Sequence, residues 1–600
     1  MGRSKEAGSR RNGSRAATHG ADTAPIRFRE APLTEDRRNF VLFAVIAALI
    51  LFGWPVVQEY LFPTARPPVT KIENGKSVPL PQPGADPTAD APAAIRDRAQ
   101  VLAETPRVRI ETPTLAGSIN LVGARIDDLT LTRHRETIAR NSPPIRLLSP
   151  AGTRDSYFAA WTWRGQGLAP PALDARWTAS GSVLAPGRPV TLTAPGGNGQ
   201  RYLIQLSVDD GYMFTVRQTV LNAGPRPVSA SAFGLVNRAA PATDTDTWTI
   251  HTGPMAVHGG QAHYEPDFDE LREEGARRFT TTGGWLGYSD LYWLTALIPD
   301  QGRSFDGQFR PGPNNAFQAD FTAAPAAVRP GAAVTQFSRF FAGAKDTRLL
   351  DRYADREGAT MLDRAIDWGW FRVIEKPIFY YLDWLFRLVG NFGVAIILLT
   401  VTFRLLVFPI AQRQFASAAA MRRLQPKMKA LQDRYKDDRV KMQQEVMALY
   451  KTEKVNPFAG CLPTLLQIPI FYALYKVLML AIEMRHQPFV GWIKDLSAPD
   501  PLTPVNLFGL LPFTPPAFIG IGVIPILLGV SMYFQFKLNP QPMDDTQKQV
   551  FAIMPWVLMF VMAPFAVGLQ VYWITSNLLG ILQQRILYAR HPEMTGAPAR

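Results

Sequence analysis

The stretch Asn391–Gln412 constrains the fold of this chain more than any other. It reads NFGVAIILLTVTFRLLVFPIAQ, and 16 uncharged, mostly apolar residues separate Arg387 from Arg404. Eight more uncharged residues follow Arg404, so the length fits a bilayer-spanning helix of about 20 residues. A cation inside such a helix costs ~2.5–3.5 kcal/mol on insertion scales and therefore indicates a functional position.

Arg404 has two interpretations. In the first, its long side chain snorkels to the nearer membrane surface. At about 1.5 Å per residue, however, it lies roughly 12 Å below the helix end near Gln412, further than the stem comfortably reaches. Thr400 precedes Arg404 by four residues and shares its helix face. We therefore favour the second interpretation, in which Arg404 faces an inward polar pocket.

The composition combines a polar part with a very apolar part. A chain of 600 residues is longer than a typical single domain, so more than one domain is expected. Of these residues 47% are hydrophobic, and the formal net charge is +14. Basic residues concentrate beside apolar runs, which favours a membrane and anionic lipid as partners over any specific nucleic-acid site. The single cysteine, Cys461, excludes a disulfide framework and a cysteine-based metal cluster. No metal and no cofactor are expected.

The N-terminal region is predicted to contain an anchor and a linker. Residues 1–38 hold nine Lys or Arg and precede an apolar run with an aromatic flank, which indicates a retained first span at 39–62 rather than a cleaved signal. The positive-inside bias places the N-terminus in the cytoplasm. Residues 63–106 are rich in Pro and Ala and should form an extended linker.

Residues 107–345 have the pattern of an all-β domain. In RYLIQLSVDDGYMFTVRQTV, Asp210-Gly211 separates two alternating segments, as a hairpin turn would. The predicted fold is a large β-sandwich outside the cytoplasm. Further strands are expected around Ser118–Val122, Tyr157–Trp163, Val190–Thr193, Thr247–His251, Leu291–Ile298 and Val334–Phe341.

Three of the seven histidines fall close together in this domain. His251, His258 and His263 lie within thirteen residues, with Glu265 nearby. Their intervals match no standard metal-ligand spacing, so we expect ordinary loop histidines, and a metal or acid–base site is the alternative.

The rest of the chain is predicted to be helical and to cross the membrane five more times, with both termini cytoplasmic. Residues 361–390 should form an amphipathic interfacial helix broken near Pro377. Lys476, near the outer end of the third span, is expected to snorkel. The expected segments are spans at 391–412, 455–483, 517–536, 549–563 and 565–588, a cytoplasmic helical hairpin at 413–454, a periplasmic loop at 484–516, a cytoplasmic loop at 537–548 and a tail at 589–600.

The hairpin should present a basic face. Met421, Leu424, Met428, Leu431 and Tyr435 recur at spacings of 3 and 4, which predicts one helical seam. The alternative is a charged loop that only fixes the topology. The basic residues of interest are Arg422, Arg423, Lys427, Lys429 and Arg434.

The predicted core spans, from 391 onward, hold almost no carboxylates. Only Glu483 occurs in them, at a boundary, which argues against an ion-coupled transporter, and no nucleotide motif supplies energy. One deep cation remains, and it can attract an acidic or polar peptide segment partway into the membrane. Its polar companions are Thr400, Gln467, Gln570, Ser576 and Asn577.

Several motifs stand out in the helical region: NFGVAIILLTVTFRLLVFPIAQRQF, MRRLQPKMKALQDRYKDD, ALYKTEKVNPFAGCLPTLLQIPIFYALYKVLM, IEMRHQPFVGWIKDLSAPDP and QVYWITSNLLGILQQ. They resemble the YidC family of membrane protein insertases, in its Gram-negative form with a large periplasmic domain. The resemblance implies a five-helix core around a hydrophilic groove, with Arg404 and Thr400 inside it. Substrate helices would leave along 462–482 and 550–563, and Tyr572 and Trp573 would supply an aromatic surface.

The resemblance also implies a function and its partners. We expect an insertase and chaperone of the bacterial inner membrane, not an enzyme, that acts alone or with the Sec translocon on nascent inner-membrane proteins. The hairpin would meet substrate, ribosome or targeting machinery, and the periplasmic domain would resemble a sugar-enzyme sandwich. The alternatives are a transporter or channel, and a membrane-anchored periplasmic carbohydrate-active enzyme that uses the three histidines.

Overall fold

The computed structural model describes residues 95–590 with gaps, and a separate hairpin of β1 (Thr70–Glu73) and β2 (Lys76–Pro79). The first span predicted at 39–62, most of the linker and most of the tail lie outside the described residues. The gaps are 240–249, 313–315, 370, 436–437, 454–461, 509, 512, 514–519 and 539–544.

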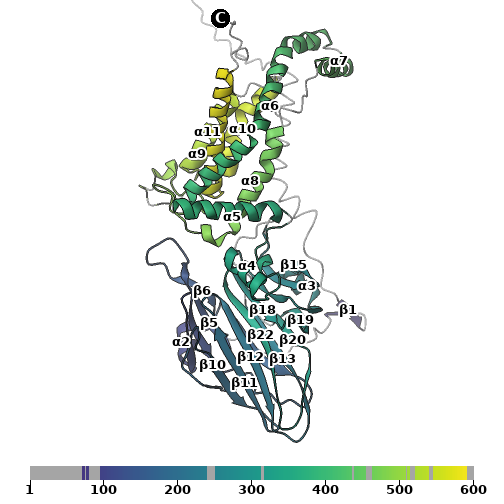
Figure 1. The fold of residues 1–600 in the computed structure, drawn as a ribbon, viewed down its shortest axis with the longest axis vertical. Coiled ribbons are helices and arrows are strands. Elements are labelled where there is room, and N and C mark those ends of the chain that lie inside the picture. The colour runs from purple at the N-terminus through teal and green to yellow at the C-terminus, as the bar shows by residue number, and fades with distance from the viewer. Residues whose placement is uncertain are drawn as a thin grey trace, which may run out of the picture. The chain divides into compact units, whose positions relative to one another are not determined.

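The described part of 107–345 forms two β-sheets that share one core (Figure 1). One has the order β15-β14-β17-β18-β22-β12-β11-β10-β8, and the other β16-β19-β20-β13-β7-β5-β4-β3-β9, with β6 and β21 paired at its side. Their bounds are β3 (Arg107–Glu111), β4 (Leu115–Asn120), β5 (Arg125–Arg135), β6 (Pro144–Leu148), β7 (Tyr157–Arg164), β8 (Thr178–Ala179), β9 (Val183–Leu184), β10 (Val190–Pro195), β11 (Gln200–Val208), β12 (Met213–Asn222), β13 (Val228–Arg238), β14 (Gly253–His258), β15 (Gln261–His263), β16 (Arg277–Thr282), β17 (Trp285–Ser289), β18 (Trp293–Pro299), β19 (Ser304–Pro311), β20 (Phe317–Ala323), β21 (Ala326–Val328) and β22 (Ala333–Ala344).

Inward-facing side chains hold the two sheets together. Trp161 on β7 meets Phe340 on β22 edge to face, with ring centroids 5.6 Å apart. Tyr157 on β7 and Thr295 on β18 share a hydrogen bond of 2.5 Å between their hydroxyls. β11 and β12 alternate buried and accessible residues, so their inner faces contribute to the core, whereas β17 is buried along its whole length.

The predicted hairpin at Asp210-Gly211 is confirmed. β11 pairs with β12 in antiparallel register, with Val208 opposite Phe214. Asp209 shapes the turn, because its carboxylate accepts hydrogen bonds from the backbone N–H of Gly211 at 2.9 Å and of Met213 at 3.0 Å. The strand expected at Thr247–His251 falls mostly outside the described residues, and β14 begins at Gly253.

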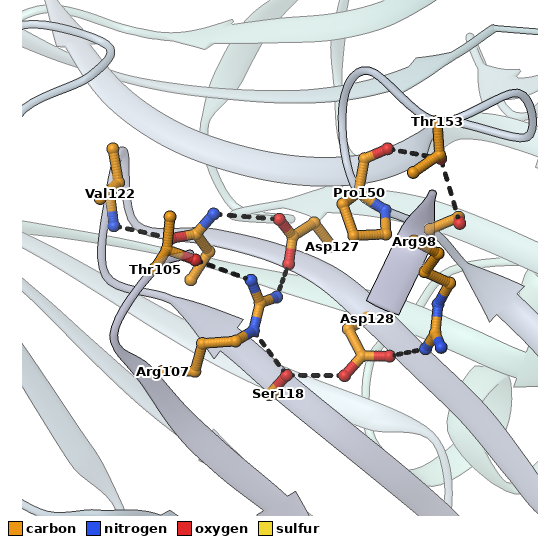
Figure 2. A network of polar contacts seen from close by, with 11 residues as sticks. Arg98, Thr105, Arg107, Ser118, Val122, Asp127, Asp128, Pro150 and Thr153 are labelled. Atoms are coloured by element: carbon orange, nitrogen blue, oxygen red, sulfur yellow. Dashed lines mark hydrogen bonds and ion pairs between the residues drawn. The ribbon is translucent and has the colours of Figure 1, made fainter. Parts of the chain in front are cut away.

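Figure 2 shows a polar network that joins the start of the domain to its strands. Arg107 on β3 forms an ion pair with Asp127 on β5 and donates from Nε to the Ser118 hydroxyl at 2.8 Å. Ser118 in turn donates to Asp128 at 2.6 Å, and Arg98 on α2 (Arg98–Ala103) pairs with that carboxylate. Burial raises the pKa of Asp127, while the charge of Arg107 opposes that rise.

Helices dominate the chain after β22 (Figure 1). One short helix, α3 (Phe268–Glu274), occurs earlier, within the β domain. Single helical turns after β22 are found at Leu362–Ala365, Ile482–Met484 and Pro504–Asn506. The helices after β22 are α4 (Thr347–Arg356), α5 (Arg372–Val389), α6 (Phe392–Arg434), α7 (Arg439–Thr452), α8 (Leu462–Leu480), α9 (Val523–Leu538), α10 (Asp545–Met562) and α11 (Val567–Arg590).

One prediction about these helices is wrong. The helix predicted at 361–390 with a break near Pro377 is instead α5, which begins at Arg372 and runs continuously through Pro377 to Val389. The segment predicted as a span at 391–412 lies within α6, which continues as one helix to Arg434, so the first arm of the hairpin is an extension of that helix.

We predict that Arg107→Ala destabilises the β domain by about 3–5 kcal/mol, because it leaves the carboxylate of Asp127, 1% exposed, without its counter-charge. Thermal unfolding of the detergent-solubilised chain, followed by tryptophan fluorescence, measures this. Arg109→Ala is the matched control. Arg109 forms an exposed ion pair with Glu111 and should contribute at most about 1 kcal/mol. Equal effects of the two substitutions would contradict the prediction.

Candidate functional site

Arg404 of α6 is held by Ser576 of α11. Its Nη2 donates to the Ser576 hydroxyl at 2.6 Å and to the Ser576 carbonyl at 2.8 Å, and its Nε donates to the same hydroxyl at 3.2 Å. Two nitrogens of the planar guanidinium group thus donate hydrogen bonds to one neutral residue. Nη1 makes no hydrogen bond to any residue that the structure describes, and the Arg404 side chain is half-buried.

Gly580, one helical turn beyond Ser576, keeps space open beside the guanidinium. A Cβ at this glycine would lie 3.7 Å from Nη2 of Arg404 and 3.5 Å from the amide nitrogen of Gln535 on α9. A larger side chain here would therefore compete with Arg404 for its place. Polar groups from α6, α9 and α11 converge at this point. Sequence reasoning missed Gln535, although it is the one amide side chain in the mostly apolar sequence of α9.

Two further polar pairs link the neighbouring helices. Gln467 on α8 donates to the hydroxyl of Tyr572 on α11. Asn577 donates to the Ser531 hydroxyl of α9 at 2.9 Å, and this hydroxyl donates a hydrogen bond to the Leu528 carbonyl at 2.8 Å. Sequence reasoning also missed Ser531, for which the only signal is a hydroxyl in an apolar run.

Trp573 lies beside this set. It meets Phe471 of α8 edge to face at 5.0 Å between centroids, so an aromatic surface does continue along α11. Its side chain is half-buried, whereas its neighbour Tyr572 is 2% exposed.

Two of the predicted companions of Arg404 form their hydrogen bonds with backbone carbonyls and are buried. Thr400 is 1% exposed, and its hydroxyl donates to the Ile396 carbonyl of its own helix at 2.6 Å, so it faces packed residues rather than an open surface. Gln570 is fully buried and donates to the carbonyls of Met562 and Phe565. It therefore fastens the turn between α10 and α11 instead of facing a ligand.

The hairpin has its second arm in α7, which packs against the end of α6. Lys427 forms an ion pair with Glu453 at 2.7 Å, and the Tyr450 hydroxyl approaches the Met428 sulfur at 3.2 Å. The side chains of Lys427, Lys429 and Arg434 are exposed. Those of Arg422 and Arg423 lie outside the described side chains.

The prediction that Lys476 snorkels is wrong. Its side chain is 2% exposed, and Nζ donates to the Asp367 carbonyl at 2.7 Å and lies 3.7 Å from the Asp367 carboxylate. The chain before α5 brings this partner to α8, so Lys476 is satisfied inside the protein. Nearby, Glu375 of α5 is fully buried, and neither carboxylate oxygen finds a hydrogen-bond partner among the described residues.

The three histidines make ordinary contacts. His251 shares a hydrogen bond with the Pro254 carbonyl at 2.9 Å. The ring of His258 lies between those of His263 and Phe279, at centroid distances of 3.7 and 4.3 Å. Within the described residues, no group of three or more His, Cys, Asp or Glu side chains is arranged to hold a metal.

Within the described part of the chain, one helical segment is long and apolar enough to cross a bilayer, Phe392–Gln412 in α6. Only 22% of its window is buried, unlike the core helix of a soluble protein. Shorter apolar helices occupy Gln467–Leu480, Val523–Leu538 and Phe551–Met562.

Comparison with known families covers both halves of the chain. The family model described as 60Kd inner membrane protein matches residues 384–594, and the YidC periplasmic domain matches residues 107–381. The chain belongs to the YidC family of membrane protein insertases. Its β-sandwich is thus the family's periplasmic domain, and its helical region is the family's inner-membrane part.

Relatives agree over almost the whole length. The membrane protein insertase YidC of Zymomonas mobilis is 49% identical over 559 residues, which cover 93% of this chain and 96% of that protein. The YidC of Methylorubrum extorquens is 42% identical over 589 residues, with the same coverage. A crystal structure of an active YidC insertase with its first transmembrane domain resolved is 17% identical, covering 90% of this chain and 98% of that one with a TM-score of 0.34.

Glu375 gives this YidC family member a predicted pH dependence. Burial raises the pKa of Glu375 to about 7, Lys476 opposes the rise and Asp367 adds to it. The pKa of Glu375 in the folded chain exceeds its ordinary value of 4.5, so the folded state favours the protonated carboxyl group. The contribution of Glu375 to the free energy of unfolding is therefore fully present at low pH and is lost as pH rises through about 7.

Glu375→Gln should therefore raise the melting temperature at pH 8 and leave it nearly unchanged at pH 5. Differential scanning fluorimetry across this range measures the effect. Glu136→Gln, at an exposed carboxylate, is the control and should change neither value. A melting temperature for Glu375→Gln that falls at pH 8 would show that the ionised carboxylate stabilises the fold.

Proposed function

We propose that this chain is an energy-independent insertase and chaperone of the bacterial inner membrane. It acts alone on small nascent membrane proteins and with the Sec translocon on larger ones. The polar flank of an incoming substrate enters a hydrophilic groove between the helices and meets the guanidinium of Arg404. One observation carries the proposal: Arg404 donates hydrogen bonds to the neutral residue Ser576, and its Nη1 makes no hydrogen bond to any described residue.

The charge of Arg404 supports this role because no acidic side chain among the described residues pairs with it. The sequences of α6 up to Gln412, α8, α9 and α11, and of α10 from Gln549 onward, contain no Asp or Glu. Ser576 stabilises the guanidinium with a hydroxyl and a carbonyl, which leaves its full positive charge in place. A half-buried cation with a free N–H pair attracts a carboxylate or a peptide carbonyl more strongly than it would in water.

Exposed apolar side chains on α8 and α10 support the exit route for substrate helices. Ile468 of α8 is 57% exposed, and α10 exposes Phe551, Ile553, Trp556 and Phe560. Such faces suit lipid tails and a hydrophobic substrate helix equally, so a helix passing along them exchanges one apolar neighbour for another.

The proposed topology has six spans, at 39–62, 391–412, 455–483, 517–536, 549–563 and 565–588, with both termini in the cytoplasm. The interfacial helix α5 and the loop at 484–516 are then on the periplasmic side. The basic hairpin at 413–454 faces the cytoplasm, where Lys427, Lys429 and Arg434 are available to ribosome, targeting machinery or anionic lipid.

Arg404→Ala should reduce the insertion of a substrate with an acidic translocated segment by about tenfold or more, the equivalent of one charge-assisted hydrogen bond. Arg404→Lys should retain an intermediate activity, because it keeps the charge and loses the fork to Ser576. Protease protection of a single-span substrate in proteoliposomes measures insertion.

Two controls make this test specific. A substrate with an uncharged translocated segment should be affected much less. Ser576→Ala preserves the charge and removes one hydroxyl, so it should cost less than Arg404→Ala. Full activity of the alanine variant on the acidic substrate would refute the proposed role of Arg404.

Crosslinking tests the route. In a Cys461→Ser background, Ile468→Cys on α8 and Phe560→Cys on α10 should form disulfides with a cysteine placed in a stalled nascent membrane protein. Leu406→Cys is the control, because it is 69% exposed and lies two residues from Arg404, about 200° around the helix. Stronger crosslinks to Leu406 than to the other two positions would place the substrate on the wrong side of α6.

A further inference from the structure

A cavity of about 790 Å³ lies at the junction of the β domain with α4 and α5. It has no part in the groove around Arg404. Its walls come from the end of β5, the turn between β11 and β12, one side of α4, and Tyr380 of α5. A volume of this size is within the usual range for small-molecule sites.

The lining is densely charged and balanced in sign. It contains four arginines and four aspartates. His134 adds no charge at neutral pH, because burial and the nearby charges of Arg485 and Arg133 lower its pKa to about 4. The eight charged residues are Arg133, Arg348, Arg352 and Arg356, and Asp210, Asp346, Asp351 and Asp355.

Half of these charges already have partners within the protein. Their contacts are Arg348 with Asp383, Asp351 with Lys376 and Tyr380, Arg352 with Glu357 at 3.6 Å, and Asp346 with the backbone N–H of Leu349 at 2.8 Å. The side chains of the other half make no hydrogen bond or ion pair with any described residue. They are Arg133, Arg356, Asp210 and Asp355. The cavity therefore offers two cations and two anions to a ligand that carries both signs.

An apolar stripe starts at the same cavity. Tyr380 lines it, and Trp384 and Leu388 follow at intervals of four residues on the same face of α5. They are 54% and 67% exposed. After Gly390 the chain enters α6, whose first 21 residues are the apolar segment long enough to span a bilayer. Charged groups of both signs next to exposed apolar groups indicate an amphiphile rather than a soluble ion.

We propose that this cavity binds the head group of a zwitterionic phospholipid with a primary amine, a phosphoethanolamine group. The guanidinium groups of Arg133 and Arg356 pair with the phosphate, and the carboxylates of Asp210 and Asp355 accept hydrogen bonds from the ammonium. The acyl chains lie along Trp384 and Leu388. A lipid with a phosphate and no amine would leave both carboxylates unpaired and facing its negative charge.

Native mass spectrometry of the full chain in detergent tests this proposal. The protein is titrated with phosphatidylethanolamine or with phosphatidylglycerol of the same acyl chains, and the retained lipid is counted. The wild type should retain phosphatidylethanolamine preferentially. Arg356→Gln and Asp355→Asn should each weaken that retention about tenfold, as expected for loss of one charge-assisted contact. Asp355→Asn should also narrow the preference over phosphatidylglycerol.

Arg226→Gln is the matched control, at an exposed arginine on a β-domain loop away from the cavity, and it should retain lipid like the wild type. All three side chains are exposed, so the fold should survive their replacement. Equal retention of the two lipids by the wild type would overturn the proposal. So would unchanged retention in both cavity variants. Soluble phosphoethanolamine that displaces the lipid at equal concentration would also overturn it, because the stripe on α5 would then contribute nothing.

Discussion

The arrangement of the membrane helices depends on how a guanidinium is satisfied among apolar side chains. Arg404 has no carboxylate partner in the described spanning helices, and a serine hydroxyl with its own carbonyl supplies the contacts instead. These hydrogen bonds fix the position of α11 relative to α6, because Ser576 must face Arg404. It also keeps the positive charge. Asn577 and Gln467 extend the polar contacts to α9 and α11, so the helices are joined around the cation.

A comparison with Lys476 explains why the half-buried Arg404 is a candidate for function and the buried Lys476 is not. Lys476 lies 3.7 Å from the carboxylate of Asp367 and donates to its carbonyl, so it is neutralised and contributes to the connection between α8 and the chain before α5. Among the described residues, the hydrogen-bond partners of Arg404 are neutral. A cation paired with a carboxylate attracts a further anion weakly, whereas a cation held by neutral groups keeps its charge for a substrate.

The sequence predicts features that depend on local patterns. It does not predict which face of each helix meets which neighbouring helix. The hairpin at Asp210-Gly211, the sandwich and the central position of Arg404 all follow from runs and alternation that are visible in the chain. Thr400 was expected beside Arg404 because it is four residues away, yet its hydroxyl bonds to its own helix, and the real partner is 172 residues distant. Strand order in the sheets and the pairing of Lys476 with Asp367 likewise require contacts that no local pattern records.

The segment after α8 shows how the periplasmic domain is coupled to the helices. Glu483 accepts a hydrogen bond at 2.9 Å from the backbone N–H of Thr347, the first residue of α4. Arg485 donates to the carbonyls of Arg135 and Glu136 at the end of β5, at 2.8 and 3.1 Å. Backbone carbonyls and an N–H are present whatever the side chains, so these contacts depend on position more than on partner identity. They join α8 to the same strand end and helix that form the charged cavity, so an occupant of that cavity would touch elements directly connected to a helix of the proposed groove.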